Sequence, residues 1–412
     1  MEKILKLIFA LCCVTVISLL LFSSIQKVSV NTYSRPPIRS IFQVSSSRHA
    51  SSIQATKVPP TTEPDINKGP PKAILVYSNL FGRRNWWDGS EKPNHLKNIG
   101  CKYHNCYITY DNSKLKDASA VVFHSRDMPP VNELRIVSRE KRPLDQYWGY
   151  FSAECPLNNP NTEPLNGLFN LTMTYKIDSD IFLPYRKFIR TDHPKPNNIN
   201  YALNKPKMAY WLVSNCGVRV REDVVRLLEK HGVQVDVGGG CRGRWPHRLQ
   251  CSGRTCRGLS EYKFYLAFEN SYCKDYVTSK YFVNGIDCNA IPIVLGGNNY
   301  SDPRLAIPGS FINVQDFPSV NKLAKYMLRV AGDDRLFNSF FKWREHYDPV
   351  VVKAGYVWPF VGKMGWPCDL CRIVHTRKPA HKVYDKLSDY WSAKNDCYGR
   401  DEKIKQILRN SF

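Results

Sequence analysis

Short apolar runs and one amphipathic segment dominate the hydrophobic pattern of this chain. Residues 72–77 and 118–124 are apolar runs rich in β-branched and aromatic residues, which predict buried strands. Residues 219–231 instead repeat apolar side chains at three- and four-residue steps and are followed by Gly232, as in an amphipathic helix. The same patterns predict strands at 209–213, 233–237, 264–268, 290–295 and 310–314 and helices at 277–286 and 321–330, the last with Ser319 as N-cap. Strands that alternate with helices predict parallel sheets covered on both faces, the α/β class.

A Pro- and Asn-rich stretch at residues 193–206 divides these elements into two halves of similar length. Each half reads as a βαβ-type, Rossmann-like unit, so we expect two such units facing a cleft, with ligands bound beyond the carboxyl ends of the strands. The predicted domains are therefore 72–200 and 201–365, followed by a cysteine-containing C-terminal tail at 366–412.

The N-terminal region has the pattern of a membrane anchor. Residues 7–25 form 19 consecutive residues without a formal charge. A hydrocarbon core about 30 Å thick needs about 20 helical residues, whereas the apolar region of a cleavable signal peptide has about 7–15. We therefore predict a cytoplasmic tail at 1–6, an uncleaved transmembrane signal-anchor at 7–25 and a flexible stem, rich in Pro, Ser and Thr, at 26–71.

The orientation of this anchor is not decided by charge, because lysines flank the apolar stretch on both sides. Cysteines and two glycosylation acceptor sequences, at Asn170 and Asn299, favour a body in the lumen. Outside the anchor the chain has twelve cysteines, an even number, as expected for disulfides in an oxidising compartment. The tightest pair, Cys368 and Cys371, has the spacing of a zinc half-site, a redox pair or disulfide partners; because no complete zinc quartet stands out, we expect disulfides.

Composition narrows the class of partner. The 412 residues carry 59 Lys and Arg against 36 Asp and Glu, a formal charge of +23, and 43% of them are hydrophobic. The apolar content excludes a wholly disordered chain, and the charge favours an anionic partner: nucleic acid, an acidic membrane face or a phosphate-bearing small molecule. The predicted anchor, and the lack of an aromatic-rich recognition module, argue against nucleic acid.

One segment places polar residues between a buried strand and a helix. Asn270 follows the strand at 264–268, and Tyr276, Thr278 and Lys280 lie where the next helix is expected to begin. A helix N-terminus carries free N–H groups and partial positive charge, so this arrangement suits a diphosphate. From the residues alone it is equally compatible with Thr278 acting only as a helix cap and Lys280 as a solvated surface lysine.

This segment, FYLAFENSxxxDYVTxKxFxNxxxxxAIPIVLG, together with the later PGSFINVxDF, closely resembles the signature of the α1,3/α1,4-fucosyltransferases. The resemblance covers essentially residues 72–371. It includes, in order, the stretches VVFHSRD, QYWGYFSAECP, FNLTMTY, DSDIFLPY and VSN followed by Arg221, and the Cys-x-x-Cys tail. It implies a single-pass type II Golgi membrane protein of the GT-B arrangement that moves fucose from GDP-fucose to a GlcNAc hydroxyl of glycoprotein glycans, most often in α1,3 linkage. No tightly bound cofactor or metal site is implied, although Mn²⁺ could stimulate without a recognisable site.

The resemblance also implies residue roles. Glu154 matches the family's carboxylate proposed as general base for the acceptor hydroxyl. Arg221 and Lys280 match the cations that hold the pyrophosphate and stabilise departing GDP. Asn270 and Tyr276 match residues that line the donor site.

One position departs from the family pattern. Ser279 stands where the family has a Glu before the motif lysine, and that Glu is thought to contact the fucose. A hydroxyl cannot stabilise developing positive charge as a carboxylate does. The alternative hypothesis is therefore a catalytically weak or inactive, fucosyltransferase-like glycan-binding protein.

Two further motifs are weaker. Asp178 and Asp180 form a D-x-D triplet, which holds Mn²⁺ in other sugar-nucleotide enzymes but here lacks the preceding apolar strand. The run Gly238 to Gly240 lacks the spacing of a phosphate-binding loop and is more simply a turn beside a cysteine.

Overall fold

The computed structural model describes residues 66–86, 91–92, 94–247, 258–349, 365–377 and 383–411, all within the compact unit Glu63–Phe412. The predicted cytoplasmic tail, the anchor and the stem up to residue 65 lie outside the described residues. Within the described ranges, no helix has both the length and the apolar character needed to cross a membrane. The location of the protein in a membrane therefore stays a prediction.

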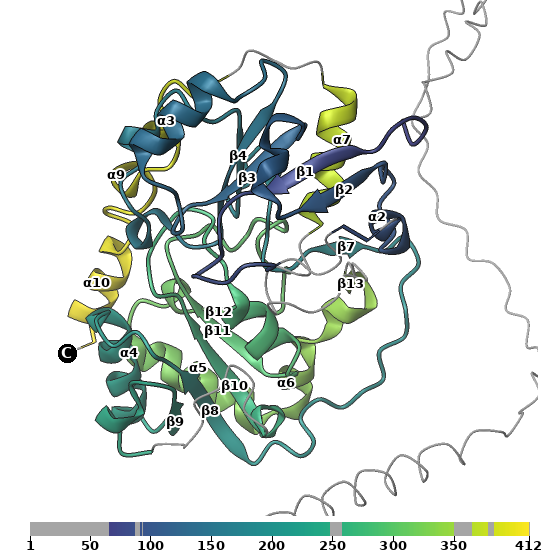
Figure 1. The fold of residues 1–412 in the computed structure, drawn as a ribbon. Coiled ribbons are helices and arrows are strands. Elements are labelled where there is room, and N and C mark those ends of the chain that lie inside the picture. The colour runs from purple at the N-terminus through teal and green to yellow at the C-terminus, as the bar shows by residue number, and fades with distance from the viewer. Residues whose placement is uncertain are drawn as a thin grey trace, which may run out of the picture. The chain divides into compact units, whose positions relative to one another are not determined.

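The first sheet is fully parallel, and helices cover both of its faces (Figure 1). Its strands, in spatial order, are β2 (Cys106–Thr109), β1 (Lys72–Val76), β3 (Ala120–His124), β4 (Tyr147–Ser152), β5 (Leu171–Thr174) and β6 (Ile181–Phe182). One face, with Ile74 and Val122, packs against α7 (Trp366–Thr376), while the other, with Leu75 and Phe123, packs against α3 (Val131–Glu140) and α8 (Leu387–Tyr390). The C-terminal part of the chain thus returns to complete the core of the N-terminal sheet.

The second sheet is also parallel and has five strands. In spatial order they are β12 (Ile312–Asn313), β11 (Ile291–Leu295), β10 (Tyr262–Phe268), β8 (Lys207–Leu212) and β9 (Val235–Gly238). Phe264 and Leu266 point to the face covered by α4 (Arg219–Lys230), α5 (Val320–Gly332), α6 (Asp334–Ser339) and α10 (Glu402–Arg409). Tyr265 points to the opposite face, which carries the π-helix η6 (Lys280–Ile286). These two sheets confirm the predicted α/β class.

Smaller elements complete the described fold. Strands β7 (Phe188–Arg190) and β13 (Tyr347–Pro349) form an antiparallel pair, and α2 (His95–Asn98) and α9 (Ala393–Asp396) are short helices. Residues 193–206 connect β7 to β8 and so lie between the strands of the two sheets, but the exact domain boundaries stay a prediction.

Most of the predicted elements are confirmed. The amphipathic pattern at 219–231 forms α4, and Gly232 follows it with a left-handed φ of 87°; Ser319 caps α5 by accepting a hydrogen bond from the Lys322 N–H. The helix expected at 277–286 begins only at Lys280, and as a π-helix, because the Thr278 N–H and hydroxyl are bound by a buried carboxylate instead. The strands β2, β4, β5 and β6 and the helices α3, α6, α7, α8 and α10 were not predicted.

Four disulfides join described cysteines, which confirms the prediction that cysteines outside the anchor form disulfides. They link Cys101 to Cys368, Cys106 to Cys371, Cys216 to Cys241 and Cys273 to Cys397. Cys368 and Cys371 therefore belong to two separate disulfides, which fasten α7 to the segment before β2 and to the first residue of β2, and not to a zinc half-site or a redox pair. Cys155 and Cys288 are free thiols.

Candidate functional site

The carboxyl ends of strands from both sheets contribute to one cavity of about 300 Å³, here called the site cavity. Its lining includes all five residues for which the sequence predicts a catalytic or donor-binding role: Glu154, Arg221, Asn270, Tyr276 and Lys280. The first follows β4, the second lies in the first turn of α4, and the other three come from the segment between β10 and the start of η6. The fold thus gathers residues that are up to 126 positions apart, from 154 to 280.

Glu154 is held on one of its two carboxylate oxygens. Its Oε2 accepts hydrogen bonds from Tyr276 Oη at 3.1 Å and from Asn158 Nδ2 at 3.2 Å, whereas within the described part of the chain Oε1 receives none. Burial raises the pKa of Tyr276 well above its usual range, so its hydroxyl stays protonated and donates. Glu154, which follows β4 of the first sheet, is therefore oriented by Tyr276, which follows β10 of the second sheet. One oxygen of the carboxylate is left for a ligand.

Arg221 is a buried cation, with 2% of its surface exposed. Its Nη2 donates to the Asn215 carbonyl at 2.6 Å and its Nη1 to the Phe268 carbonyl at 3.3 Å, which joins the ends of β8 and β10. Burial lowers the pKa of Arg221, but a guanidinium stays charged at neutral pH. Its Nε is buried without a hydrogen-bond partner among the described residues. A buried charge with an unused donor is suited to an anionic ligand.

Lys280 is positioned by a carboxylate that the sequence analysis did not single out. Glu269, 1% exposed, accepts from Lys280 Nζ at 2.9 Å, from the Thr278 N–H at 2.8 Å and from the Thr278 hydroxyl at 2.9 Å. The lysine side chain is 22% exposed, so it faces the cavity while its charge is compensated from behind. Thr278 and Lys280 thus belong to one hydrogen-bond network around Glu269. From sequence this segment was interpreted as a diphosphate site or as a helix cap with a surface lysine, and neither interpretation included this network. The signal for Glu269 was an acidic residue directly after an apolar strand.

Charge in the site cavity is mostly positive. Arg221 and Lys280 line it, and Glu154 is the acidic side chain among its described lining residues. Ser279 also lines it and brings no charge. Asn270 adds an amide oxygen that is buried without a hydrogen-bond partner among the described residues. Two cations and one carboxylate facing each other can bind a diphosphate and accept a proton from a neutral second ligand.

A second carboxylate group near Glu154 organises the rim of the site cavity. Asp127 accepts from the N–H groups of Phe81 and Gly82, each at 2.7 Å, and its Oδ2 lies 2.6 Å from His124 Nδ1. Burial lowers the pKa of His124, which keeps the ring neutral at pH 7. The ring of Phe81 lines the site cavity and is 40% exposed. In the sequence, His124 and Asp127 belong to the stretch VVFHSRD, which by itself indicates no role for either residue.

The two predicted glycosylation acceptors differ in exposure. Asn299 is exposed, so it stays a candidate for modification. Asn170 is only 8% exposed, and its side-chain oxygen accepts from the Trp148 N–H at 2.9 Å and from Arg142. Modification of Asn170 stays a prediction, at an amide that is largely buried in the folded structure.

The weaker motifs have structural roles. Asp180 Oδ2 accepts from the Thr172 N–H at 2.9 Å and from Tyr384 Oη at 2.8 Å, which uses this carboxylate inside the first half. Gly239 has a φ of 91° in the turn that leads to Cys241, and a Cβ there would lie 2.4 Å from the Val213 carbonyl oxygen. The one cluster of metal-type ligands found among the described residues includes Cys106 and Cys371, which are joined in a disulfide.

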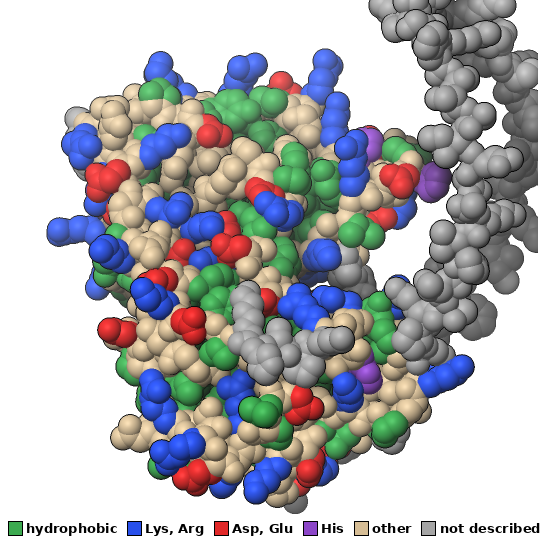
Figure 2. All heavy atoms as spheres, turned by 90° about the horizontal axis from the view of Figure 1, so that it is seen from above, with side chains coloured by type: hydrophobic (Ala, Val, Ile, Leu, Met, Phe, Trp, Pro, Cys, Tyr) green, Lys and Arg blue, Asp and Glu red, His purple; other side chains and the backbone are tan. Residues whose placement is uncertain are grey.

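On the face of the molecule drawn in Figure 2, the positively charged side chains do not gather in one patch. Lys and Arg side chains are spread widely over it, with Asp and Glu side chains between them. This pattern is unlike the single basic stripe of a nucleic-acid-binding face. The cations of the site cavity are therefore the more specific feature for binding an anion.

Comparisons with known proteins identify similar chains. The family model described as glycosyltransferase family 10 (fucosyltransferase), C-terminal, matches residues 202–391, and that of the fucosyltransferase N-terminal part matches residues 69–186. Alpha-(1,3)-fucosyltransferase C of Drosophila melanogaster is 32% identical over 358 residues, covering 79% of this chain and 78% of that protein. Glycoprotein 3-alpha-L-fucosyltransferase A of the same organism is 31% identical over 358 residues, covering 84% of this chain and 65% of that protein.

A bovine relative and a solved structure extend the comparison. The 3-galactosyl-N-acetylglucosaminide 4-alpha-L-fucosyltransferase of Bos taurus is 37% identical over 249 residues, covering 59% of this chain and 65% of that protein. The chain thus spans slightly less than two thirds of the length of two of these relatives. A crystal structure of an alpha1,3-fucosyltransferase with GDP-fucose aligns with a TM-score of 0.45 at 17% identity, covering 77% of this chain and 93% of that one.

Proposed function

Because the chain belongs to glycosyltransferase family 10, the fucosyltransferases, we propose that it transfers fucose from GDP-fucose to a GlcNAc hydroxyl of glycoprotein glycans, in α1,3 linkage. One observation carries this proposal: a carboxylate from one half and two cations from the other line the same cavity. Relatives named as 3-alpha- and alpha-(1,3)-fucosyltransferases support the choice of sugar and linkage.

The reaction assigns one task to each group. Glu154 takes the proton from the acceptor hydroxyl as that oxygen forms a bond to C1 of fucose. The bond from C1 to the β-phosphate oxygen breaks, and GDP leaves with the electron pair. Arg221 and Lys280 hold the charge that develops on the leaving diphosphate. Attack from the face opposite to a β-linked GDP inverts C1 and gives an α-fucoside, through an oxocarbenium-like transition state.

The surroundings of Glu154 support its role as base. Tyr276 and Asn158 bind Oε2 and leave Oε1 free to face the acceptor. Asn270, with its unpartnered amide oxygen, is suited to bind a hydroxyl of the fucose. No step of this scheme is routed through a metal ion, and whether Mn²⁺ stimulates the enzyme is a separate question for assay.

The direct test is transfer itself. The purified chain is incubated with GDP-fucose and a panel of N-glycan glycopeptides, and products are read by mass spectrometry for the gain of one deoxyhexose, followed by linkage analysis. Glu154→Gln should lower the rate by about 10²–10⁴-fold, the usual contribution of a general base, while GDP-fucose binding stays near that of the wild type. Binding of GDP-fucose without transfer to any acceptor would contradict the proposal.

Ser279 favours a second candidate function. It lines the site cavity without supplying a carboxylate, so a glycan-binding protein with weak or no transferase activity is the alternative. The same assay separates the two, because that protein would bind glycans and leave GDP-fucose unconsumed.

We also propose that the protein is a single-pass type II protein of the Golgi membrane, with the described body in the lumen. The apolar stretch at 7–25 and the disulfides support this location, since disulfides persist in oxidising compartments. Protease added to sealed Golgi vesicles tests this topology. The body should be protected from cleavage in intact vesicles and should be cleaved once detergent opens them.

A further inference from the structure

The C-terminal residues build a second cavity beside the first. This cavity, here called the C-terminal cavity, measures about 560 Å³. It is lined by the start of α4, by residues 270–272 after β10, by Leu157 and by the segment from Cys397 to Lys405. That last segment follows residue 391, where the match to the family model ends. Asn270 lines both cavities, so the two adjoin at this residue.

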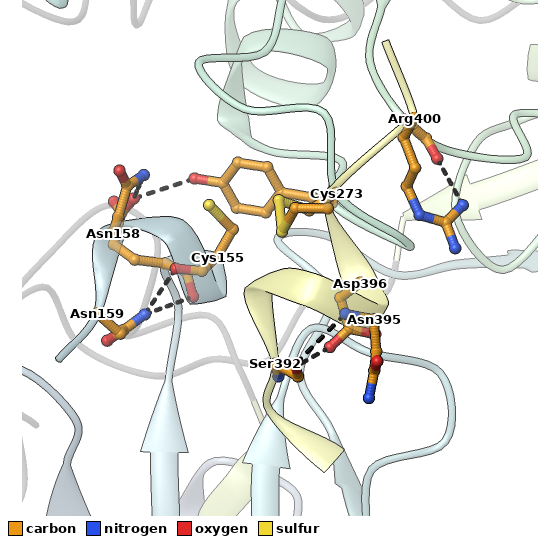
Figure 3. Close-up of a disulfide and its surroundings, with 12 residues drawn as sticks. Cys155, Asn158, Asn159, Cys273, Ser392, Asn395, Asp396 and Arg400 are labelled. Carbon is orange, nitrogen blue, oxygen red and sulfur yellow. Dashed lines mark hydrogen bonds between the residues drawn. A yellow bond between two sulfur atoms is a disulfide. The ribbon is translucent and has the colours of Figure 1, made fainter. Parts of the chain in front are cut away.

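The C-terminal segment forms a fixed wall. The disulfide from Cys273 to Cys397 ties it to the loop after β10 (Figure 3). The Lys274 N–H also donates to the Asp396 carbonyl at 2.7 Å. The Asp396 carboxylate lies 3.1 Å from Lys176 Nζ, with both side chains at most 6% exposed. Farther along, α10 inserts apolar side chains into the core of the second sheet. The shape of the C-terminal cavity is therefore set by covalent and buried contacts.

Two polar side chains that line this cavity have unused hydrogen-bonding groups. Tyr272 is 7% exposed, and its hydroxyl has no hydrogen-bond partner among the described residues. The Asn270 Oδ1 is in the same state. Burial raises the pKa of Tyr272, so the hydroxyl is protonated and can donate as well as accept. Because buried polar groups are normally hydrogen-bonded, the Tyr272 hydroxyl indicates a polar ligand in this cavity, while the Asn270 oxygen marks the boundary with the donor side.

Charge and exposure narrow the chemistry of that ligand. Arg219 and Lys405 line the cavity together with Asp401 and Glu402, and Lys405 Nζ lies 3.0 Å and 2.9 Å from the two carboxylates. Positive and negative side chains are thus balanced, in contrast to the site cavity. Tyr398, at the same cavity, is 65% exposed and offers an aromatic face. A neutral ligand with hydroxyl groups and one apolar face fits best, which is the chemistry of a hexose.

We propose that the C-terminal cavity binds a neutral sugar of the acceptor glycan, at least one residue away from the sugar that receives fucose. This inference rests on the proposed function, because it takes the acceptor to be an oligosaccharide. Tyr398 stacks on the apolar face of the bound sugar, and the Tyr272 hydroxyl binds one of its hydroxyls. The C-terminal segment thereby makes the enzyme selective for extended acceptors.

Acceptor length is the variable that tests this site. KM is measured for a disaccharide acceptor, N-acetyllactosamine, and for a glycopeptide with a complete N-glycan. Tyr398→Ala should raise KM for the glycopeptide by about five- to ten-fold, corresponding to about 1–1.4 kcal/mol, and leave KM for the disaccharide and for GDP-fucose unchanged. Tyr272→Phe removes only the hydroxyl and should act in the same direction.

Controls separate this site from general effects. Tyr398→Phe keeps the ring and should retain the wild-type KM, and Leu144→Ala alters a 95% exposed side chain that lines neither cavity. An equal change in KM for both acceptors, or no change for the glycopeptide, would overturn the inference. If the wild type transfers no fucose, the proposed function fails, and saturation-transfer NMR with the same glycopeptide tests the sugar site separately. Loss in Tyr398→Ala of the glycan saturation-transfer signals that the wild type gives would support the site, and unchanged signals would refute it.

Discussion

Replacing Arg221 by lysine tests whether a buried guanidinium holds the diphosphate. The guanidinium now bridges two carbonyl groups, those of Asn215 and Phe268, and keeps Nε unused. A lysine has one nitrogen and cannot reproduce this planar fork. With 2% of the native side chain exposed, the new ammonium group would also be buried. The substitution therefore changes geometry and charge together.

The size of both effects follows from the burial of this position. Loss of a hydrogen bond to a charged group costs about 1.5–3 kcal/mol, which weakens GDP binding by about 10–150-fold. Full burial lowers the pKa of a lysine by about 3–5 units from about 10.4. The variant lysine is then mostly neutral at pH 8.5 and partly charged at pH 6, whereas the native arginine stays charged throughout. GDP binding by the variant should recover as the pH falls.

Calorimetric titration of GDP into wild type and Arg221→Lys between pH 6 and 8.5 measures this. The quantity to follow is the dissociation constant of the variant divided by that of the wild type. Titration of the phosphate itself affects both proteins equally and cancels in this ratio. We expect the ratio to fall by about tenfold from pH 8.5 to pH 6. Lys280→Arg, at the more exposed cation, serves as the control and should show a ratio that is independent of pH. A constant ratio for Arg221→Lys, or wild-type affinity, would refute the reasoning.

The other predictions concern the neighbours of these groups. Glu269→Gln leaves Lys280 without its buried counter-charge and should lower the free energy of unfolding, measured by urea titration, by about 2–4 kcal/mol. This is less than the full cost of breaking a buried pair, because water reaches the ammonium group. An unchanged unfolding midpoint would contradict this prediction. Tyr276→Phe removes one of the two donors that orient Glu154 and should lower kcat by about tenfold with little change in GDP affinity, so a loss confined to GDP binding would instead assign the tyrosine to the donor. Ser279→Glu restores a carboxylate and should raise kcat with GDP-fucose if the serine limits the native enzyme, while equal rates in both proteins would remove Ser279 as a cause of weak activity.

The sequence predicted the fold best where one local pattern was sufficient. The strand at 264–268 and the helix at 219–231 have strong patterns, and both appear as β10 and α4. By contrast, β6 has only two residues, and α3 begins after a proline without a capping side chain, so neither offered as strong a local signal. Disulfide partners could not be deduced either, because Cys101 and Cys368 are 267 positions apart and nothing local links them.

The site was predictable only in part from physical patterns. The polar cluster around Lys280 follows from strand, loop and helix order, but Glu154 and Arg221 were identified through resemblance to a family. The buried Glu269 network and the contact between Tyr276 and Glu154 arise from tertiary folding, which sequence spacing does not encode. Asn170 shows the opposite limit, since its acceptor sequence is local whereas its burial in the folded chain is not.

The loop from residue 269 to residue 280 explains how one chain can position both reaction partners. Glu269 fixes its end by binding Thr278, and the disulfide of Cys273 fixes its middle. Asp275, with a left-handed φ of 59°, accepts from the Ile177 N–H at 3.2 Å and so anchors the loop to the first half.

These three anchors act on the same short segment, so the backbone that carries Tyr276 and Lys280 is held at three points. In the proposed reaction, the Tyr276 hydroxyl orients the base that serves the acceptor, and the Lys280 ammonium group faces the leaving group of the donor. Catalysis by positioning requires both to be set before the substrates meet. An anchor of this loop lies in the C-terminal segment, at Cys397, which also forms a wall of the C-terminal cavity. The C-terminal cavity and the loop that carries Tyr276 and Lys280 thus share one covalent support, the disulfide from Cys273 to Cys397.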